Sequence, residues 1–273
     1  VASQRIADKE MLVHRVPIMF NVIGLGWAGP LILKMGSDEE KHRYLKGILT
    51  GEDIWCQGFS EPDHGSDLGN SQTTAVRDGD EYIINGTKIW TTFGNYAKYM
   101  ILLARTNPDA ERKYAGLSYF LSPMEVPGVK AVPIQKITGE YGFTETFFDN
   151  ARIPADCLMG EEGQGWGIAT QTLQFERSAE GGQASEYFAE RVTMDDLMKS
   201  AKTIMRDGEP LLNDPVVRDN LVTFMMEEKA LKLSTVRAGI PALCSDYPLS
   251  LALSGKLRAS ELFRRMRQYA VAI

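Results

Sequence analysis

The sequence predicts an α+β protein in which a helical segment, a β-domain and a second helical segment follow one another. Three observations predict this. Apolar residues recur at helical spacing in residues 1–53, alternating and turn-rich segments fill residues 54–157, and helical patterns return in residues 158–273. We therefore expect an N-terminal helical domain, a middle domain built as an antiparallel sheet or small barrel, and a C-terminal helical bundle, with those boundaries.

The first segment contains a clear helix start. Ser37 and Glu40 form an S-x-x-E capping-box pattern, and apolar residues then recur on one helix face at Tyr44, Leu45, Ile48 and Leu49. Residues 24–29 read GLGWAG and have closely spaced glycines. No strand precedes them and no acidic residue follows at the required distance, so they predict tight helix packing and not a nucleotide-binding loop.

The middle segment contains turn dipeptides between apolar runs. Asp78-Gly79 and Asn85-Gly86 each predict a hairpin turn, because Asp-Gly and Asn-Gly adopt the positive φ angles of such turns. The expected strands include residues 82–84, 89–90, 99–103, 117–121, 129–134 and 146–148. Together they predict a sheet with antiparallel pairing.

The third segment predicts three helices. Residues 163–165, GQG, open a long helix that we expect to continue past Met198. Residues 206–208, RDG, break the helical pattern, and residues 213–215, NDP, supply an N-cap and a first-turn proline for the next helix. The last helix is expected over residues 249–273.

Composition excludes several classes of function. The 273-residue chain carries a net charge of −6, which argues against a nucleic-acid-binding surface. Its three cysteines are few, widely spaced and odd in number, which indicates a reducing compartment and no disulfide framework. Its three histidines lack metal-ligand spacing, so no metal site is expected. The longest uncharged run, residues 16–33, contains two prolines and is predicted to be a buried, broken helix and not a membrane span.

Two stretches point to a binding site. Residues 55–67, WCQGFSEPDHGSD, form a polar turn after an apolar entry and offer free backbone N–H groups with the hydroxyls of Ser60 and Ser66. In residues 88–95, KIWTTFGN, Trp90 and Thr92 would share one face of a strand. Such groups can hold a flat heterocycle and a phosphate. From the residues alone, an ordinary turn and a core tryptophan are the more common interpretations of these features.

The runs SEPDHGSD, DGDEYIINGTKIWTT and FFDNARIPADCLMGEEGQGW, in this order, closely resemble the acyl-CoA dehydrogenase family of flavoproteins. The resemblance extends from about residue 20 to residue 273. It implies FAD as cofactor, an acyl-CoA substrate oxidised to trans-2-enoyl-CoA, transfer of electrons to an electron-transfer flavoprotein, and a homo-oligomer (a dimer or tetramer). It also implies that the family's first and last helices are absent from this chain. A bacterial cytoplasm is the preferred location, with the mitochondrial matrix as the alternative for a eukaryotic protein.

The resemblance assigns individual residues to the cofactor. The FAD-binding positions are Gln57, Gly58, Phe59, Ser60, Gly65, Ser66, Trp90, Thr91, Thr92 and Arg206. Ser66 and Arg177 also fall on substrate-binding positions. Asp63 and His64 replace the family's usual small pair, which alters the expected mouth of the coenzyme A channel. Near Arg206, which is expected to reach the FAD of a neighbouring subunit, the family's Phe-Gly pair lacks its phenylalanine.

The catalytic base is assigned to Glu176. In one group of the family, which includes isovaleryl-CoA dehydrogenase, a glutamate on the long helix directly precedes an arginine, and LQFERS places Glu176 and Arg177 there. A buried carboxylate beside an apolar substrate would have its pKa raised towards the useful range. A structural Glu176–Arg177 ion pair, a role for Glu180, and a base beyond residue 273 are the alternatives.

Two rival functions remain at this point. The same scaffold hosts acyl-CoA oxidases and flavin monooxygenases, which admit oxygen to the reduced flavin. A non-catalytic partner subunit of a heteromeric dehydrogenase is the other. The sequence leaves the acyl chain open between straight, branched and sterol side-chain substrates.

Overall fold

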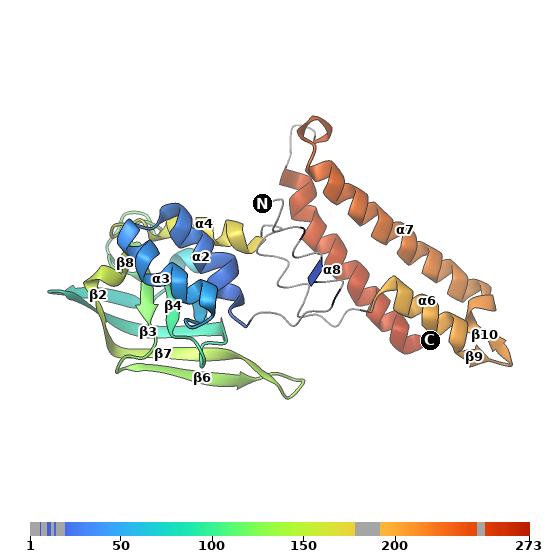
Figure 1. Cartoon of the computed structure of the whole chain (residues 1–273), viewed down its shortest axis with the longest axis horizontal. Coiled ribbons are helices and arrows are strands. Elements are labelled where there is room, and N and C mark those ends of the chain that lie inside the picture. The colour runs from blue at the N-terminus through green and yellow to red at the C-terminus, as the bar shows by residue number, and fades with distance from the viewer. Residues whose placement is uncertain (1–5, 7–9, 12–13, 15–19, 178–191, 245–248) are drawn as a thin grey trace. The chain divides into compact units, whose positions relative to one another are not determined.

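A computed structural model of the chain forms two compact units, Val1–Phe188 and Ala189–Ile273 (Figure 1). The structure describes all residues except 1–5, 7–9, 12–13, 15–19, 178–191 and 245–248. Each unit has its own apolar core, and each is described by itself.

In the first unit, helices cover one face of a sheet (Figure 1). The helical elements are a π-helical turn, η1 (Gly24–Ala28), followed by α2 (Gly29–Met35), α3 (Asp38–Thr50) and α4 (Gly165–Arg177). The GLGWAG run is therefore helical, as its sequence context predicts. Leu31 and Ile48 from the helices pack with Trp55 and Ile101 from the sheet in one buried layer.

The start of α3 confirms the predicted capping box. The Ser37 side chain accepts a hydrogen bond from the N–H of Glu40, and the Glu40 carboxylate accepts one from the N–H of Ser37. Tyr44 and Ile48 are buried, whereas Leu49 at the edge of the predicted face is exposed. The apolar stripe of α3 is thus narrower than its sequence predicts.

The sheet of the first unit has eight strands. They are β1 (Trp55–Gly58), β2 (Thr74–Asp78), β3 (Glu81–Thr92), β4 (Tyr99–Arg105), β5 (Leu117–Pro123), β6 (Val129–Gln135), β7 (Tyr141–Pro154) and β8 (Leu158–Met159). Their order is β6-β7-β3-β2-β4-β5-β8, with β1 paired to β4. Most pairs are antiparallel, but β1 and the end of β2 run parallel to β4. The α+β fold class is confirmed.

One of the two predicted hairpin turns is wrong. Gly79 does lie in the turn between β2 and β3, but Asn85-Gly86 lies inside β3, where the register against β7 shifts. Gly86 has a φ of +144°, and the Asn85 side chain accepts a hydrogen bond from the N–H of Asn150. Two residues of β7, Asp149 and Asn150, stand opposite Asn85, and both Gly86 and Asn150 have positive φ. Positive φ can accompany a β-bulge as well as a turn, so the dipeptide alone does not distinguish the two.

The second unit contains three described helices and a small hairpin. They are α6 (Met194–Thr203), the strands β9 (Met205–Arg206) and β10 (Glu209–Pro210), α7 (Pro215–Ala238) and α8 (Leu249–Ala272). Leu197, Leu221, Phe224, Leu262 and Met266 form its buried core. Short 3-10 turns over both units span Leu68–Asn70, Ala155–Cys157, Leu211–Asn213 and Pro241–Leu243.

The prediction of one helix continuing past Met198 is wrong. Thr193 adopts an extended conformation and forms a capping box with Asp196, so a new helix begins at Met194. The predicted break at residues 206–208 is confirmed, because Asp207 and Gly208 have positive φ in the β9–β10 turn. The predicted start of α7 is confirmed, since Asp214 caps the N–H groups of Val216 and Val217.

Within the described part of the chain, every helix is too short or too polar to cross a lipid bilayer.

The bulge at Gly86 makes a stability prediction. A Cβ at Gly86 would stand 2.6 Å from Thr73 Oγ1 and 2.7 Å from its Cα, whereas a Cβ at Gly79 would have no neighbour within 4 Å. Both glycines have positive φ. We expect Gly79→Ala to lower the free energy of unfolding by about 1 kcal/mol and Gly86→Ala by about 3 kcal/mol, through backbone strain plus overpacking. Urea denaturation measures both, and equal losses would contradict the assignment.

Candidate functional site

The two stretches predicted to bind the cofactor lie against each other. The turn after β1 is closed by paired backbone hydrogen bonds between Glu61 and His64, at 3.2 and 3.1 Å. The N–H of Ile89 on β3 donates to the carbonyl of Ser60 at 2.9 Å. The structure therefore brings residues 57–66 and residues 88–92 together, although more than twenty residues separate them in the chain.

A buried ion pair fixes this contact. Lys88 Nζ lies 2.8 Å from Glu61 Oε1 and 3.0 Å from the carbonyl oxygen of Phe59. The Lys88 side chain is fully buried, and that of Glu61 is 5% exposed. The Glu61 carboxylate also accepts the backbone N–H groups of Gln72 at 2.6 Å and Thr73 at 2.9 Å. Three segments of chain thus meet at one carboxylate.

The environment shifts the pKa of both partners. Burial lowers the pKa of Lys88 to about 8, although Glu61 opposes this shift. Burial by itself raises the pKa of Glu61, but Lys88 and the two backbone donors outweigh it and hold that pKa below its usual value of 4.5. Sequence reasoning missed this pair. Its only signal was a lysine in a strand of apolar residues, next to the predicted binding turn.

The stretch around Trp90 is irregular. Lys88 pairs with Thr146 and Thr91 with Thr144, so two residues of β3 stand opposite one residue of β7. Trp90 has a φ of +60° and is 58% exposed. Thr91 is buried and Thr92 half-buried. The predicted regular strand with Trp90 and Thr92 on one face is therefore corrected to a bulge, which presents an indole in a rare backbone conformation to solvent.

Unpartnered polar atoms fit a flat, hydrogen-bonding ligand. Six buried side-chain polar atoms of the described residues find no hydrogen-bond partner, and Gln57 Oε1 and Thr91 Oγ1 are two of them. Buried polar atoms without partners are uncommon, and these two lie in the two predicted cofactor stretches. No heavy atom stands within 4 Å of where a Cβ at Gly65 would be. The turn thus leaves open space at Gly65, as a cofactor would need.

The other turn residues predicted to bind FAD range from buried to exposed. Gly58 and Phe59 are buried, Ser60 is half-buried and Ser66 is exposed. A Cβ added at Gly58 would overlap the sulfur of Met100 on β4. Phe59 packs edge-on against Tyr119 of β5, with ring centroids 6.0 Å apart. Packing of Gly58 and Phe59 against β4 and β5 therefore holds the turn, while the hydroxyl of Ser66 is exposed to solvent.

Helix α4 places Glu176 on its inward face. Gly165, Ile168, Ala169 and Thr172 are the buried residues of this helix, and Glu176 follows Thr172 by four positions. Residues four apart lie on one side of a helix, so the carboxylate continues the buried stripe. Glu176 is half-buried, and Arg177 is the last described residue of α4. The alternative base Glu180 lies outside the described residues.

Arg206 belongs to the second unit. It lies in β9, is exposed, and its guanidinium is 3.6 Å from the carboxylate of Asp214. Its predicted role at the FAD of a neighbouring subunit remains a prediction.

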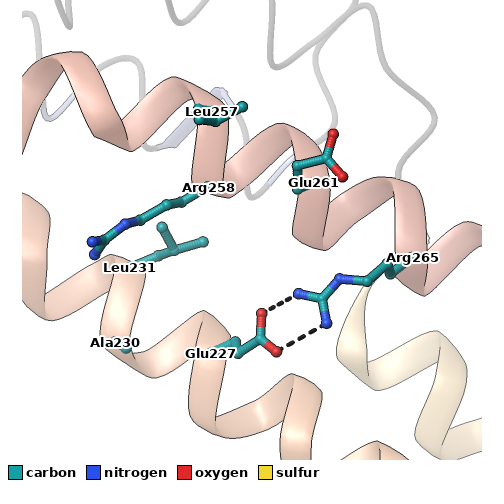
Figure 2. A pocket seen from close by; sticks show the side chains of 7 residues that line it. All are labelled: Glu227, Ala230, Leu231, Leu257, Arg258, Glu261 and Arg265. Carbon is teal, nitrogen blue, oxygen red and sulfur yellow. Dashed lines mark hydrogen bonds and ion pairs between the residues drawn. The ribbon is translucent and has the colours of Figure 1, made fainter.

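A pocket of about 380 Å³ lies between α7 and α8 (Figure 2). Leu231 and Leu257 line it, and Arg265 and Glu227 form a two-pronged ion pair at one end. None of the predicted site residues lines this pocket. In the part of the chain that the structure describes, no group of three His, Cys, Asp or Glu side chains is placed to hold a metal.

Two family models match this chain. The acyl-CoA dehydrogenase middle domain matches residues 56–151, and the acyl-CoA dehydrogenase C-terminal domain matches residues 163–273. The chain belongs to the acyl-CoA dehydrogenase family. This family is FAD-dependent, which confirms the cofactor that the sequence resemblance implies.

Individual relatives agree with this family. Acyl-CoA dehydrogenase IpdE1 of Mycobacterium tuberculosis is 39% identical over 203 residues, covering 74% of this chain and 52% of the relative. An acyl-CoA dehydrogenase from Geobacillus kaustophilus superimposes with a TM-score of 0.79 at 28% identity, covering 91% of this chain and 65% of that structure. The Tcur3481-Tcur3483 steroid ACAD gives 0.76 at 31% identity, with 91% and 62% covered. The chain spans about half the length of the curated relatives it matches.

The buried ion pair makes a strong stability prediction. Lys88→Met leaves the buried Glu61 carboxylate without its cation, so we expect a loss of about 3–5 kcal/mol in the free energy of unfolding. Lys98→Met is the matched control, because Lys98 pairs with Asp53 at 2.6 Å but is half exposed, and should cost about 1 kcal/mol or less. Urea unfolding at pH 7 compares them. A smaller loss for Lys88→Met than for Lys98→Met would contradict the role of the pair.

The deficit of Lys88→Met should shrink in acid. In the wild type, the lowered pKa of Glu61 gives stability that is present above about pH 4.5 and is lost as pH falls through the folded pKa. In the variant, burial without Lys88 raises that pKa, so protonation on acidification relieves the unpaired charge. Unfolding curves between pH 7 and pH 4 measure the difference, and a deficit that grows in acid would contradict this account.

Proposed function

We propose that this protein is an FAD-dependent acyl-CoA dehydrogenase that converts an acyl-CoA thioester to the trans-2-enoyl-CoA. The observation that carries the proposal is the position of Glu176. It continues the buried face of α4 in the same compact unit as the cofactor turn. Family membership supports the chemistry, and the turn and the bulge supply the residues to hold the cofactor.

The cofactor residues divide the work by their surroundings. Thr92 and Ser60 offer half-buried hydroxyls, and the exposed indole of Trp90 offers a flat wall beside them. Gln57 Oε1 is a buried acceptor that has no hydrogen-bond donor within the described part of the chain. Bound FAD supplies the two-electron acceptor that takes the β-hydrogen as hydride. The chain's own contribution is to hold the ring flat and to exclude water from beneath it.

Glu176 is the proposed general base. Its carboxylate takes the α-proton of the thioester as the β-hydrogen leaves with its electron pair, so that the Cα–Cβ bond becomes a double bond. Arg177 assists it from the adjacent position on α4. Ser66 is exposed, which supports its proposed contact with the acyl-CoA at the mouth of the site. The acyl chain itself is left open by these residues.

We further propose that electrons pass to an electron-transfer flavoprotein and that the enzyme works as a homo-oligomer, a dimer or tetramer, in the β-oxidation of an acyl chain. The exposed Trp90 indole gives an aromatic edge at the protein surface beside the cofactor turn, which supports transfer to an external partner.

A partner subunit of a heteromeric dehydrogenase is the second candidate. It is favoured by the similarity to the Tcur3481-Tcur3483 steroid ACAD, whose name gives two proteins. This candidate differs in one measurable respect. A partner subunit purified alone would bind no flavin or would hold a flavin that no acyl-CoA reduces.

The proposed base makes a direct prediction. Anaerobic titration of the purified protein with straight-chain, branched and steroid side-chain acyl-CoAs should bleach the flavin absorbance with one class. Glu176→Gln should bind FAD normally and slow that bleaching by about 10²- to 10⁴-fold, the usual contribution of a general base. Glu161→Gln, on an exposed loop, is the control and should bleach at the wild-type rate.

Three results would overturn this assignment. Full-rate bleaching by Glu176→Gln would remove Glu176 as the base. A protein without flavin, or with flavin that no acyl-CoA bleaches, would favour the partner subunit. Rapid reoxidation of the reduced protein in air would favour an oxidase or monooxygenase on the same scaffold.

Thr92 tests the cofactor assignment separately from turnover. Thr92→Val removes one hydroxyl from the proposed cradle and should raise the dissociation constant for FAD about fivefold, the value of one hydrogen bond of about 1 kcal/mol. Thr87→Val changes a half-buried threonine on the same strand outside the cradle and is the control. Isothermal titration of the apoprotein with FAD measures both, and equal dissociation constants would contradict the cradle.

A further inference from the structure

A buried hydrogen bond joins the sheet to the helix that carries the proposed base. The hydroxyl groups of Tyr119 on β5 and Thr172 on α4 lie 2.9 Å apart, and both side chains are fully buried. Burial raises the pKa of Tyr119, so its hydroxyl stays protonated. The pair is therefore neutral and cannot serve as an acid or base in the reaction.

The direction of this hydrogen bond follows from the neighbouring contacts. Thr172 Oγ1 donates its only proton to the carbonyl oxygen of Ile168, at 3.1 Å. A hydroxyl has one proton to donate and two lone pairs to accept, so Thr172 can only accept from Tyr119. Tyr119 is consequently the donor, and Thr172 is its acceptor.

Thr172 and Glu176 lie on the same side of α4. The two residues are four apart on α4, so a rotation of the helix that moves Thr172 away from Tyr119 turns Glu176 through the same angle. Two other contacts hold α4: Gly165 lies against the backbone of Ser118, and Gln171 Oε1 accepts a hydrogen bond from Lys34 Nζ of α2 at 2.7 Å on the exposed surface. The apolar contacts of Ile168 and Ala169 do not by themselves prescribe an orientation. A hydrogen bond does prescribe one, because it weakens steeply when misaligned.

The same tyrosine contacts the cofactor turn. Its ring meets Phe59 edge-on, with an angle of 84° between the ring planes, and the Phe59 carbonyl accepts from the buried Lys88. The ring of Tyr119 thus packs against Phe59 of the cofactor turn, and its hydroxyl bonds to α4, the helix that carries Glu176. The Tyr119 side chain therefore contacts both the cofactor turn and α4, and proton removal depends on the distance between these two parts.

We propose that the hydrogen bond from Tyr119 to Thr172 is a positioning contact that sets the rotation of α4, and through it the aim of Glu176 at the substrate α-carbon. This inference rests on the proposed function. Tyr119 and Thr172 are positioning residues, because neither touches the reacting atoms.

The test uses three variants of the FAD-loaded enzyme. Thr172→Val keeps the shape of the side chain but strands the buried Tyr119 hydroxyl, so kcat should fall about tenfold and the thermal midpoint should drop. Thr172→Ser keeps the acceptor and should restore kcat to within twofold of wild type. Tyr119→Phe leaves Thr172 bonded to Ile168, so kcat should again fall about tenfold with a smaller drop in midpoint.

Matched measurements separate positioning from general damage. Thr170, two residues earlier, makes the same kind of backbone contact, to Trp166 at 2.8 Å, but it is exposed, so Thr170→Val should change neither kcat nor the midpoint. The dissociation constant for FAD and the KM for acyl-CoA should stay within twofold in all variants. Incorporation of solvent deuterium at the substrate α-carbon should slow in parallel with kcat, since it reports proton removal alone.

Distinct outcomes would overturn this proposal. Wild-type kcat in both Thr172→Val and Tyr119→Phe would remove the contact from the reaction, and so would equal loss in Thr172→Ser and Thr172→Val. Glu176→Gln is measured alongside. If it is inactive while the Tyr119 and Thr172 variants are normal, only the positioning role fails. If it is fully active, the base assignment itself fails.

Discussion

The first unit depends on a charge that has been taken out of water. Glu61 collects a lysine ammonium and two backbone N–H groups, so one carboxylate holds the cofactor turn, β3 and the approach to β2 at fixed separations. Buried ion pairs contribute little net stability compared with apolar packing, but removing one partner is costly. The Glu61–Lys88 ion pair therefore serves to position the cofactor turn and contributes little to net stability. A polar turn of this kind has little apolar surface with which to fix itself, and Lys88 provides the missing constraint.

The first unit combines directional hydrogen bonds with apolar packing. The turn and the bulge are held by directional contacts, and Phe59 transmits their position to Tyr119 through an aromatic packing contact. Helix α4 is held by its apolar stripe and by a surface hydrogen bond from Lys34 to Gln171, and its buried face is oriented by the hydroxyl pair at Thr172. Dehydrogenation needs a base and a hydride acceptor on a single substrate, so an error in either part misplaces the reaction.

The sequence predicted those features that local chemistry determines. The capping box at Ser37, the helix start at residues 213–215 and the α+β order follow from residue types at short spacing, and all three are confirmed. The bulge at Gly86 was read as a turn, because positive φ is common to both and only the pairing with β7 separates them. The helix start at Met194 does have a local signal, the Thr193–Asp196 capping box, which the prediction of one long helix overlooked. The Lys88 pair depends on Glu61, 27 residues away, which no local pattern reports. The roles of Glu176 and Arg206 rest on resemblance and stay predictions.

Gly58 carries a consequence for how this sequence can vary. The space where its side chain would be is filled by the sulfur of Met100 on the neighbouring strand β4. Position 58 can therefore accept alanine only when position 100 becomes smaller. A smaller residue at position 100, with glycine kept at position 58, would leave a void. In a library of variants selected for folding, these two positions should change together. The volume shared between them, and not the identity of either residue, is the quantity that selection would conserve.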